Sequence, residues 1–306
     1  MQKKAPRNKT LTLTPNEQTS LLEKAAKLGK KTSLAEIKDK IVWQDTFKVM
    51  DFMPSKCVDL MIVDPPYNLN KNFGTSNFKE MSDDKYAEWL DSWLRKTVRL
   101  LKDNASIYIC TDWKSSISVP FVAGKYFILQ NRISWEREKG RGALKNWKNC
   151  LEDIWFFTKS KNYKFNIDSV KILRSVLAPY KDKKGQPKDW FQRDENKVRL
   201  TYPSNIWTDI SVPFWSMAEN TPHPTQKPEK LIAKLILASS DEGDVVFDPF
   251  VGSGTTAVVA KKLKRHFIGI EKEKEYVAYA LKRLAMADKD NGIQGFNNGI
   301  FYHRNM

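Results

Sequence analysis

A glycine-rich segment that follows a short apolar run constrains the fold of this chain most strongly. Residues 245–247 (Val-Val-Phe) have the length of a buried strand, and residues 252–255 (Gly-Ser-Gly-Thr) follow where a helix is expected to begin. Around them the sequence predicts strands near 41–43, 58–63, 105–110, 127–135, 154–158 and 266–270, and helices near 15–28, 82–101, 228–237, 256–263 and 274–287. Thr14 and Glu17 are predicted to form a capping box at the start of the first of these helices, and residues 68–81 are predicted to form a loop. This alternation predicts an α/β fold with a mostly parallel sheet and helices on both faces. Ligands of such sheets bind beyond the carboxyl ends of the strands.

The glycine-rich segment also predicts a ligand that contains an adenosine. Glycines let a ligand approach the backbone closely, and the N-terminus of the following helix favours a carboxylate or a phosphate. Glu271 ends the next predicted strand, 17 residues after Gly254, where its carboxylate can accept hydrogen bonds from both ribose hydroxyls. The same spacing fits a dinucleotide site, so an NAD-dependent oxidoreductase is an alternative at this point.

A second special loop, Asp64-Pro65-Pro66-Tyr67, follows the apolar run at 58–63. Its two prolines end the strand because proline cannot donate to a sheet ladder. An exocyclic amine of a nucleobase is a poor nucleophile, since its lone pair is delocalised into the ring. Asp64 and the Pro65 carbonyl can accept hydrogen bonds from the two amino hydrogens, and Tyr67 can stack on a base extruded from the duplex. Such catalysis rests on positioning and fixed polarity and needs no metal.

Together, the two loops resemble those of the amino-group DNA methyltransferases. Asp64-Pro65-Pro66-Tyr67 matches the catalytic motif, residues 247–255 resemble the cofactor loop, and residues 223–228 (His-Pro-Thr-Gln-Lys-Pro) are similar to the segment that precedes it. The catalytic motif comes first, as in the β class of adenine-N6 enzymes, whose sheet is circularly permuted. The resemblance implies a Rossmann-like permuted methyltransferase sheet of seven mostly parallel strands, with a small inserted target-recognition region.

The resemblance also implies a role for each motif residue. The catalytic residues would be Asp64, Pro65, Pro66 and Tyr67, which hold the adenine amine and stack on the base. The cofactor would be S-adenosyl-L-methionine, bound by Asp45, Thr225, Lys227, Asp248, Pro249, Phe250, Gly252, Ser253, Gly254, Thr255 and Glu271. Within that set Glu271 would hold the ribose, Asp45 would contact the adenine, and Thr225 and Lys227 would meet the carboxylate.

The expected reaction is methylation of adenine N6 in duplex DNA at a short sequence, in a restriction-modification system or by an orphan modification enzyme. Cytosine-N4 methylation is the nearest alternative, because its chemistry is the same. The family usually has Ser at position 64 in that case, so Asp64 favours adenine. A non-catalytic DNA-binding module is a further hypothesis from a different class.

The charge of the chain points to a polyanionic partner. The formal net charge is +16, and residues 139–200 hold 16 Lys and Arg against 7 Asp and Glu, with aromatic residues interleaved. Concentrated positive charge among aromatic side chains is typical of nucleic-acid-binding faces. Double-stranded DNA is therefore the expected partner. The resemblance adds a second copy of the chain and a cognate restriction endonuclease as candidates.

Strand–helix alternation is lost after residue 162 and returns at Pro228. This pattern predicts a basic N-terminal helical arm at 1–40, a catalytic domain at 41–162 and 222–287, a target-recognition region at 163–221 and a C-terminal tail at 288–306. No apolar run approaches the roughly 18 residues that a membrane span needs. A cytoplasmic location is therefore expected, and the resemblance implies that the cell is a bacterium or archaeon and that the protein lies near its nucleoid.

Overall fold

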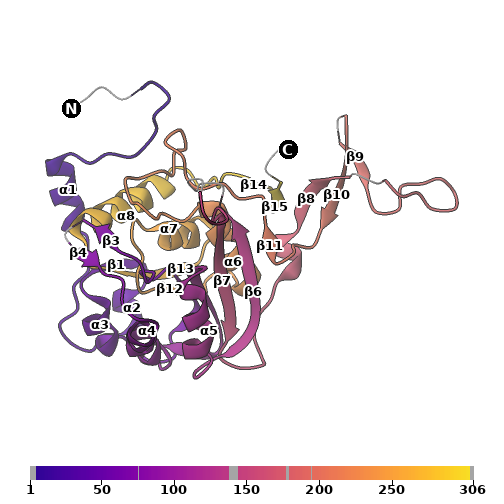
Figure 1. Cartoon of the computed structure of the whole chain (residues 1–306). Coiled ribbons are helices and arrows are strands. Elements are labelled where there is room, and N and C mark those ends of the chain that lie inside the picture. Colours follow the sequence, from indigo (N-terminus) through magenta and orange to yellow (C-terminus); the bar gives the residue numbers. More distant parts are fainter. Residues whose placement is uncertain (1–4, 75, 138–143, 177–178, 194, 304–306) are drawn as a thin grey trace.

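A large central sheet organises the protein. The computed structural model describes residues 5–74, 76–137, 144–176, 179–193 and 195–303. The strands of the central sheet are β1 (Lys40–Trp43), β2 (Val58–Val63), β5 (Leu101–Asp112), β6 (Ile128–Glu136), β7 (Leu151–Thr158), β11 (Ile206–Trp207), β12 (Val245–Asp248) and β13 (His266–Glu271). They lie in the order β1-β13-β12-β2-β5-β7-β6-β11 (Figure 1).

The direction of the strands confirms the predicted class. The first five strands of this order are mutually parallel, whereas β7 runs antiparallel to both β5 and β6. In the part of the chain that the structure describes, this sheet has eight strands instead of the predicted seven. The additional strand is β11, which pairs parallel with β6. It has only two residues and lies between prolines at 203 and 213, so no alternating pattern marks it in the sequence.

Helices cover both faces of the central sheet. One face packs against α3 (Thr46–Val49), α4 (Asp83–Thr97) and α5 (Ser118–Ala123), and the other against α6 (Glu229–Ser239), α7 (Thr255–Lys262) and α8 (Lys274–Ala287). Alternate residues of β2 enter the two cores, because successive side chains of a strand point to opposite faces. Leu60 and Ile62 join the core beneath α6 to α8, whereas Met61 and Val63 join the core beneath α4 and α5. None of the helices that the structure describes is long and apolar enough to cross a bilayer.

Three predicted element boundaries were wrong. Helix α1 (Pro15–Leu22) begins with the predicted capping box of Thr14 and Glu17 but ends before Leu28, because the backbone of Ala26 pairs with Ile41 and Trp43 of β1. Leu101 begins β5 and does not extend α4. Residues 68–81, predicted as a loop, contain the hairpin strands β3 (Lys71–Phe73) and β4 (Ser76–Phe78).

A second sheet joins the predicted target-recognition region to the predicted C-terminal tail. Its strands are β8 (Ile172–Ser175), β9 (Phe191–Arg193), β10 (Asn196–Thr201), β14 (Phe296–Asn297) and β15 (Ile300–Tyr302), in the order β14-β15-β8-β10-β9. β15 pairs parallel with β8, and Phe301 is buried beside Ile172. In Figure 1, β8, β9 and β10 extend away from the central sheet on the side opposite α1.

The remaining short helices are α2 (Leu34–Ile37) and the 3₁₀ helices η1 (Met50–Phe52), η2 (Ser115–Ile117) and η3 (Ile167–Val170). Some predictions extend to residues outside the described ranges. These are residues 1–4 of the predicted arm, 139–143 of the basic stretch, 177–178 and 194 of the predicted target-recognition region, and 304–306 of the predicted tail.

Candidate active site

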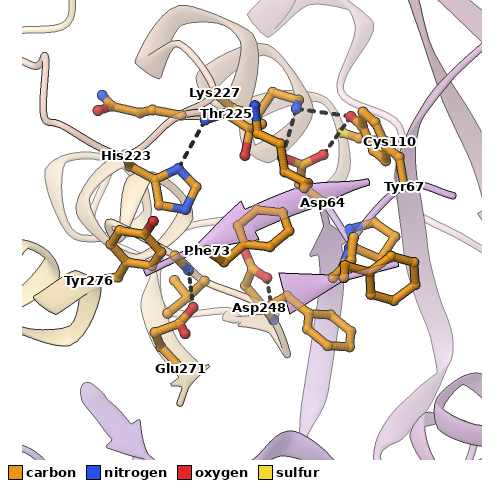
Figure 2. A pocket seen from close by; sticks show the side chains of 18 of the residues that line it. Asp64, Tyr67, Phe73, Cys110, His223, Thr225, Lys227, Asp248, Glu271 and Tyr276 are labelled. Atoms are coloured by element: carbon orange, nitrogen blue, oxygen red, sulfur yellow. Dashed lines mark hydrogen bonds and ion pairs between the residues drawn. The ribbon is translucent and has the colours of Figure 1, made fainter. Parts of the chain in front are cut away.

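The two loops singled out in the sequence lie in one pocket. Strands β2 and β12 are hydrogen-bonded neighbours, with Leu60 opposite Val246 and Met61 opposite Phe247, so their carboxyl ends meet at one edge of the sheet. The pocket at this edge has a volume of about 380 Å³. Its lining includes Asp45, Asp64, Pro65, Pro66, Tyr67, Thr225, Lys227, Asp248, Pro249, Phe250, Gly252, Ser253, Thr255 and Glu271. Figure 2 labels Asp64, Tyr67, Thr225, Lys227, Asp248 and Glu271 among them. Segments nearly two hundred residues apart in the sequence are thus brought together.

The two glycines of the glycine-rich loop have different structural roles. Gly252 lines the pocket with a φ of +53°, and a Cβ there would lie 2.9 Å from His223 Nε2. Gly254 was predicted to bind cofactor, but it lies outside the pocket lining. Its φ is +88°, and a Cβ would lie 2.7 Å from the Cβ of Ala280 in α8. Gly254 therefore permits the close approach of α7 and α8 that holds the loop in place.

Hydrogen bonds with Asp248 and Arg283 hold the glycine-rich loop in its conformation. Asp248 Oδ1 accepts a hydrogen bond from the Phe250 amide at 3.0 Å, and Oδ2 accepts one from Thr256 Oγ1 at 2.6 Å. Burial raises the pKa of Asp248 to about 7. Arg283 Nη1 donates to the Ser253 carbonyl at 3.0 Å and to Thr255 Oγ1 at 2.9 Å. The loop is thus held in its conformation by buried polar groups of the chain itself.

Glu271 presents a buried carboxylate to the pocket. Its Oε2 accepts a hydrogen bond from the Gly252 amide at 3.0 Å, and its Oε1 accepts one from the Glu273 amide at 2.7 Å. Burial raises its pKa to about 7. A carboxylate oxygen has two lone pairs, so each oxygen keeps the capacity to accept a hydrogen bond from a ligand hydroxyl. This geometry suits a vicinal diol such as that of a ribose.

The pocket is acidic although the chain is basic. Among the residues that the structure describes, seven Asp and Glu line the pocket, against four Lys and Arg, while the whole chain carries +16. Aromatic side chains lie on the same wall, where Phe250 contacts Trp89 and Trp93 with ring centroids 6.0 Å and 5.4 Å apart. Acidic and aromatic walls together favour a cationic ligand. A neutral or anionic cofactor would gain less from this lining.

Asp64 is engaged by two neighbours. Its Oδ2 lies 2.7 Å from Lys227 Nζ, and its Oδ1 accepts a hydrogen bond from the Tyr67 hydroxyl at 2.7 Å (Figure 2). Lys227 Nζ also lies 3.0 Å from the Tyr67 hydroxyl oxygen. Burial raises the pKa of Asp64, and the Lys227 ammonium opposes that rise. Lys227 was predicted to meet the carboxylate of a cofactor, whereas the structure places its ammonium on the predicted catalytic carboxylate.

Glu152 is a site residue that the sequence analysis missed. Its Oε2 lies 3.2 Å from Lys227 Nζ and 3.2 Å from the Tyr67 hydroxyl, and its Oε1 accepts a hydrogen bond from Arg137 Nη1 at 2.6 Å. Because β7 runs antiparallel, its amino end lies at the edge where the parallel strands have their carboxyl ends. The available signal was the pair of acids at 152 and 153, which opens an otherwise apolar strand.

His223 was also missed as an individual site residue. It lies between Gly252 and Tyr276, with its ring centroid 4.3 Å from that of Tyr276. Its Nδ1 accepts a hydrogen bond from the Thr225 amide at 3.3 Å. Burial, together with nearby Lys227, lowers the pKa of His223 to about 3, so its ring is neutral. His223 therefore acts as a polar wall of the pocket and carries no charge there.

Several known proteins are similar to this chain in sequence and fold. Residues 58–282 match the family described as DNA methylase. The type II methyltransferase M.HpaI of Haemophilus parainfluenzae is 35% identical over 85% of this chain and 76% of its own length. The DNA adenine methyltransferase YhdJ of Escherichia coli (strain K12) is 35% identical over 81% of this chain and 83% of its own length.

Solved structures agree with the architecture. The crystal structure of M1.HpyAVI superposes with a TM-score of 0.51 at 26% identity, covering 80% of this chain and 97% of that one. The cytosine-N4-specific PvuII DNA methyltransferase superposes with a TM-score of 0.60 at 18% identity, covering 87% of this chain and 94% of that one, which shows the fold alone. With one pocket formed by both loops and a family match over most of the chain, this protein belongs to the DNA methylase family.

Proposed function

We propose that this enzyme transfers a methyl group from S-adenosylmethionine to N6 of an adenine in duplex DNA. The observation that carries the proposal is the shared pocket of the Asp64–Tyr67 loop and the glycine-rich loop. Asp64 favours adenine, and the relative YhdJ is named a DNA adenine methyltransferase. The PvuII enzyme, named for cytosine N4, is only 18% identical, so it gives no comparable support for that alternative.

The pocket fits S-adenosylmethionine. When bound, this cofactor supplies an electrophilic methyl group on a positively charged sulfur. Glu271 would accept hydrogen bonds from the ribose hydroxyls, and the loop from Asp248 to Thr255 would hold the methionine end. Asp45, which caps α3 by accepting a hydrogen bond from the Phe47 amide at 2.8 Å, would contact the adenine from the far end of the pocket. The acidic lining suits the positive charges of this cofactor.

The catalytic loop would supply the acceptors for the target amine. The Pro66 carbonyl accepts a hydrogen bond from the Tyr86 hydroxyl at 3.0 Å, which fixes the direction of the proline backbone. The Asp64 carboxylate and the Pro65 carbonyl would then accept hydrogen bonds from the two amino hydrogens. After the carbon–nitrogen bond forms, N6 must lose a proton, and Asp64 is the adjacent buried carboxylate that can accept it.

The second sheet would contact the DNA. Its strands β9 and β10 carry exposed basic side chains beside half-buried aromatic rings, with Lys197 Nζ 5.4 Å from the centroid of Trp190 and Arg193 5.2 Å from that of Tyr302. We assign target recognition to residues 163–221 together with the C-terminal strands that complete this sheet. A second copy of the chain, a cognate endonuclease and a prokaryotic cytosolic location belong to the same proposal and follow from the family resemblance.

A methylation assay tests the proposal. Unmethylated genomic DNA is incubated with the protein and S-adenosylmethionine labelled in the methyl group, then digested to nucleosides and separated. The expected product is N6-methyladenosine in its deoxy form, and Asp64→Ala should bind cofactor but give no product. Label in N4-methylcytosine would contradict the adenine assignment. Binding of NAD without S-adenosylmethionine would favour the oxidoreductase alternative.

A further inference from the structure

One buried ammonium contacts two carboxylates at the predicted catalytic loop. Lys227 Nζ lies 2.7 Å from Asp64 Oδ2 and 3.2 Å from Glu152 Oε2. The Lys227 and Glu152 side chains are 7% and 5% exposed and that of Asp64 is 20% exposed, so water screens the contact between Lys227 and Glu152 least. The Tyr67 hydroxyl lies between the same two acids, 2.7 Å from Asp64 Oδ1 and 3.2 Å from Glu152 Oε2. Both groups that hold Asp64 are therefore also within reach of Glu152.

This arrangement weakens Asp64 for its task unless the contacts rearrange. Each Asp64 oxygen keeps a lone pair for an adenine amine, but the Lys227 ammonium and the Tyr67 hydroxyl already bind this carboxylate and make it a weaker hydrogen-bond and proton acceptor. Leaving a buried ammonium or hydroxyl without a partner costs on the order of 1–3 kcal/mol or more. Lys227 and Tyr67 can release Asp64 without this free-energy cost only if another acceptor takes their hydrogen bonds at the same time.

Glu152 is placed to be that acceptor. Its Oε1 is held by Arg137 Nη1 at 2.6 Å, and its backbone lies in the register of β7 against β5 and β6. Its Oε2 remains directed at Lys227 and Tyr67. We infer that Glu152 is a positioning residue for methyl transfer, which takes over Lys227 and the Tyr67 hydroxyl when the base enters and so frees Asp64 for the amine. This inference rests on the proposed function.

The charges of the cluster give the inference a specific signature. The Glu152 carboxylate raises the pKa of Asp64, and the Lys227 ammonium lowers it. Removing Glu152 should therefore move the acid limb of the kcat/KM profile to lower pH, and removing Lys227 should move it to higher pH. A charge a few ångströms away changes a pKa by about 1–3 units. A role confined to folding would scale activity equally at every pH.

The test compares Glu152→Gln, Lys227→Met and the double variant with the wild type. For each protein, kcat/KM for DNA is measured from pH 5.5 to 9, and cofactor affinity is measured by calorimetry. We expect Glu152→Gln to lower kcat by roughly 100-fold, the scale of a misplaced catalytic group, without changing cofactor affinity. We expect the double variant to be more active than Lys227→Met, because it no longer buries two carboxylates without an ammonium.

Asp153→Asn is the matched control. Asp153 is the neighbouring buried acid of β7, but it points to the other face, where it accepts hydrogen bonds from Arg132 and Ser116. Asp153→Asn should lower the free energy of unfolding without moving the acid limb of the kcat/KM profile. If the wild type is active and the acid limb of the kcat/KM profile is the same in Glu152→Gln, the inference is overturned but the proposed function is not. A tenfold loss of cofactor affinity in Lys227→Met would also overturn it, since Lys227 would then serve the cofactor. A wild type that methylates no DNA would contradict the proposed function as well.

Discussion

The backbone amide of Gly252 donates a hydrogen bond to Oε2 of Glu271 across 3.0 Å. This bond links the glycine-rich loop after β12 to the end of the neighbouring strand β13, and it sets the distance between the two groups proposed to hold the cofactor. The carboxylate thus has a structural role beside its proposed ligand-binding role, and substitutions at 271 can separate the two.

Glu271→Ala should weaken S-adenosylmethionine binding by about 10- to 100-fold, the scale expected for lost hydrogen bonds to a charged group. Glu271→Gln should lose less, because its amide oxygen can still accept one hydrogen bond. Calorimetric titration with the cofactor measures both effects, and DNA binding by each variant serves as the control. Equal cofactor affinity in all three proteins would contradict the assignment of Glu271.

Asp248→Asn should stabilise the protein at alkaline pH. The pKa of Asp248 is about 7 in the folded protein, against an ordinary value of 3.8. Between these values the folded state binds more protons than the unfolded state, so the free energy of unfolding falls as pH rises from about 4 to 7. An Asn at this position has no such dependence and can still accept from the Phe250 amide. We expect Asn to add ~1–3 kcal/mol at pH 8 and nothing near pH 4, as measured by urea unfolding.

Gly254→Ala should destabilise the protein strongly. The new Cβ would meet both the backbone and the Cβ of Ala280, at 2.8 Å and 2.7 Å, and φ is +88°. Gly243→Ala is the control, because Gly243 has a similar φ of +84° but nothing within 4 Å of its Cβ position. We expect a loss of about 1 kcal/mol at 243 from backbone strain alone and ~3 kcal/mol or more at 254. Thermal unfolding would show whether the two losses differ; equal losses would remove the packing role of Gly254.

Tyr67→Ala should reduce turnover far more than cofactor affinity, because it removes the stacking face, worth about 1–3 kcal/mol per base. Tyr67→Phe keeps that face and loses the hydroxyl that Asp64 and Lys227 share. Turnover should therefore be highest in the wild type, lower in Tyr67→Phe and lowest in Tyr67→Ala. Steady-state kinetics on DNA and cofactor titration measure the two quantities. Loss of cofactor binding with base capture intact would refute the stacking role.

Binding of DNA should weaken steeply with salt, and Lys197→Ala and Arg193→Ala should each reduce the slope of log affinity against log salt by about one. Arg193 lies on the edge strand β9 of the second sheet, and Lys197 lies on the neighbouring strand β10. Lys264→Ala is the control, because Lys264 lies beside Glu242 at the amino ends of β12 and β13, opposite the pocket edge. Fluorescence anisotropy at several salt concentrations decides. Equal slopes of log affinity against log salt in all variants would mean that the DNA does not bind at the second sheet.

The sequence predicted those parts of the site that depend on single strands and the turns after them. Asp64, Asp248 and Glu271 each end a buried apolar run, so their place at the carboxyl edge followed from strand length and turn residues alone. Glu152 begins its strand, and only the antiparallel pairing of β7 brings it to that edge. Strand direction depends on the whole sheet, so no local pattern could reveal it.

Other misses have similar causes. The hairpin of β3 and β4 is short and polar, and it depends on contacts such as that between Phe78 and Trp89, with ring centroids 5.1 Å apart. The cofactor role of Lys227 stays a prediction, but its motif did not reveal the contacts with Asp64 and Glu152, because the acceptor that a lysine takes depends on the three-dimensional arrangement of acids around it. The participation of residues 296–302 in the second sheet depends on pairing between distant segments.

The ladder between β2 and β12 has a consequence for engineering this enzyme. It joins the proposed methyl-donor wall and the proposed methyl-acceptor wall into one frame, whereas β8, β9 and β10 hydrogen-bond within the second sheet, although Ile172 of β8 packs in the core beneath α6 to α8. Under the proposed assignment of target recognition, exchanging residues 174–201 for the corresponding segment of a relative should redirect the enzyme to a new DNA sequence while the geometry of transfer is kept.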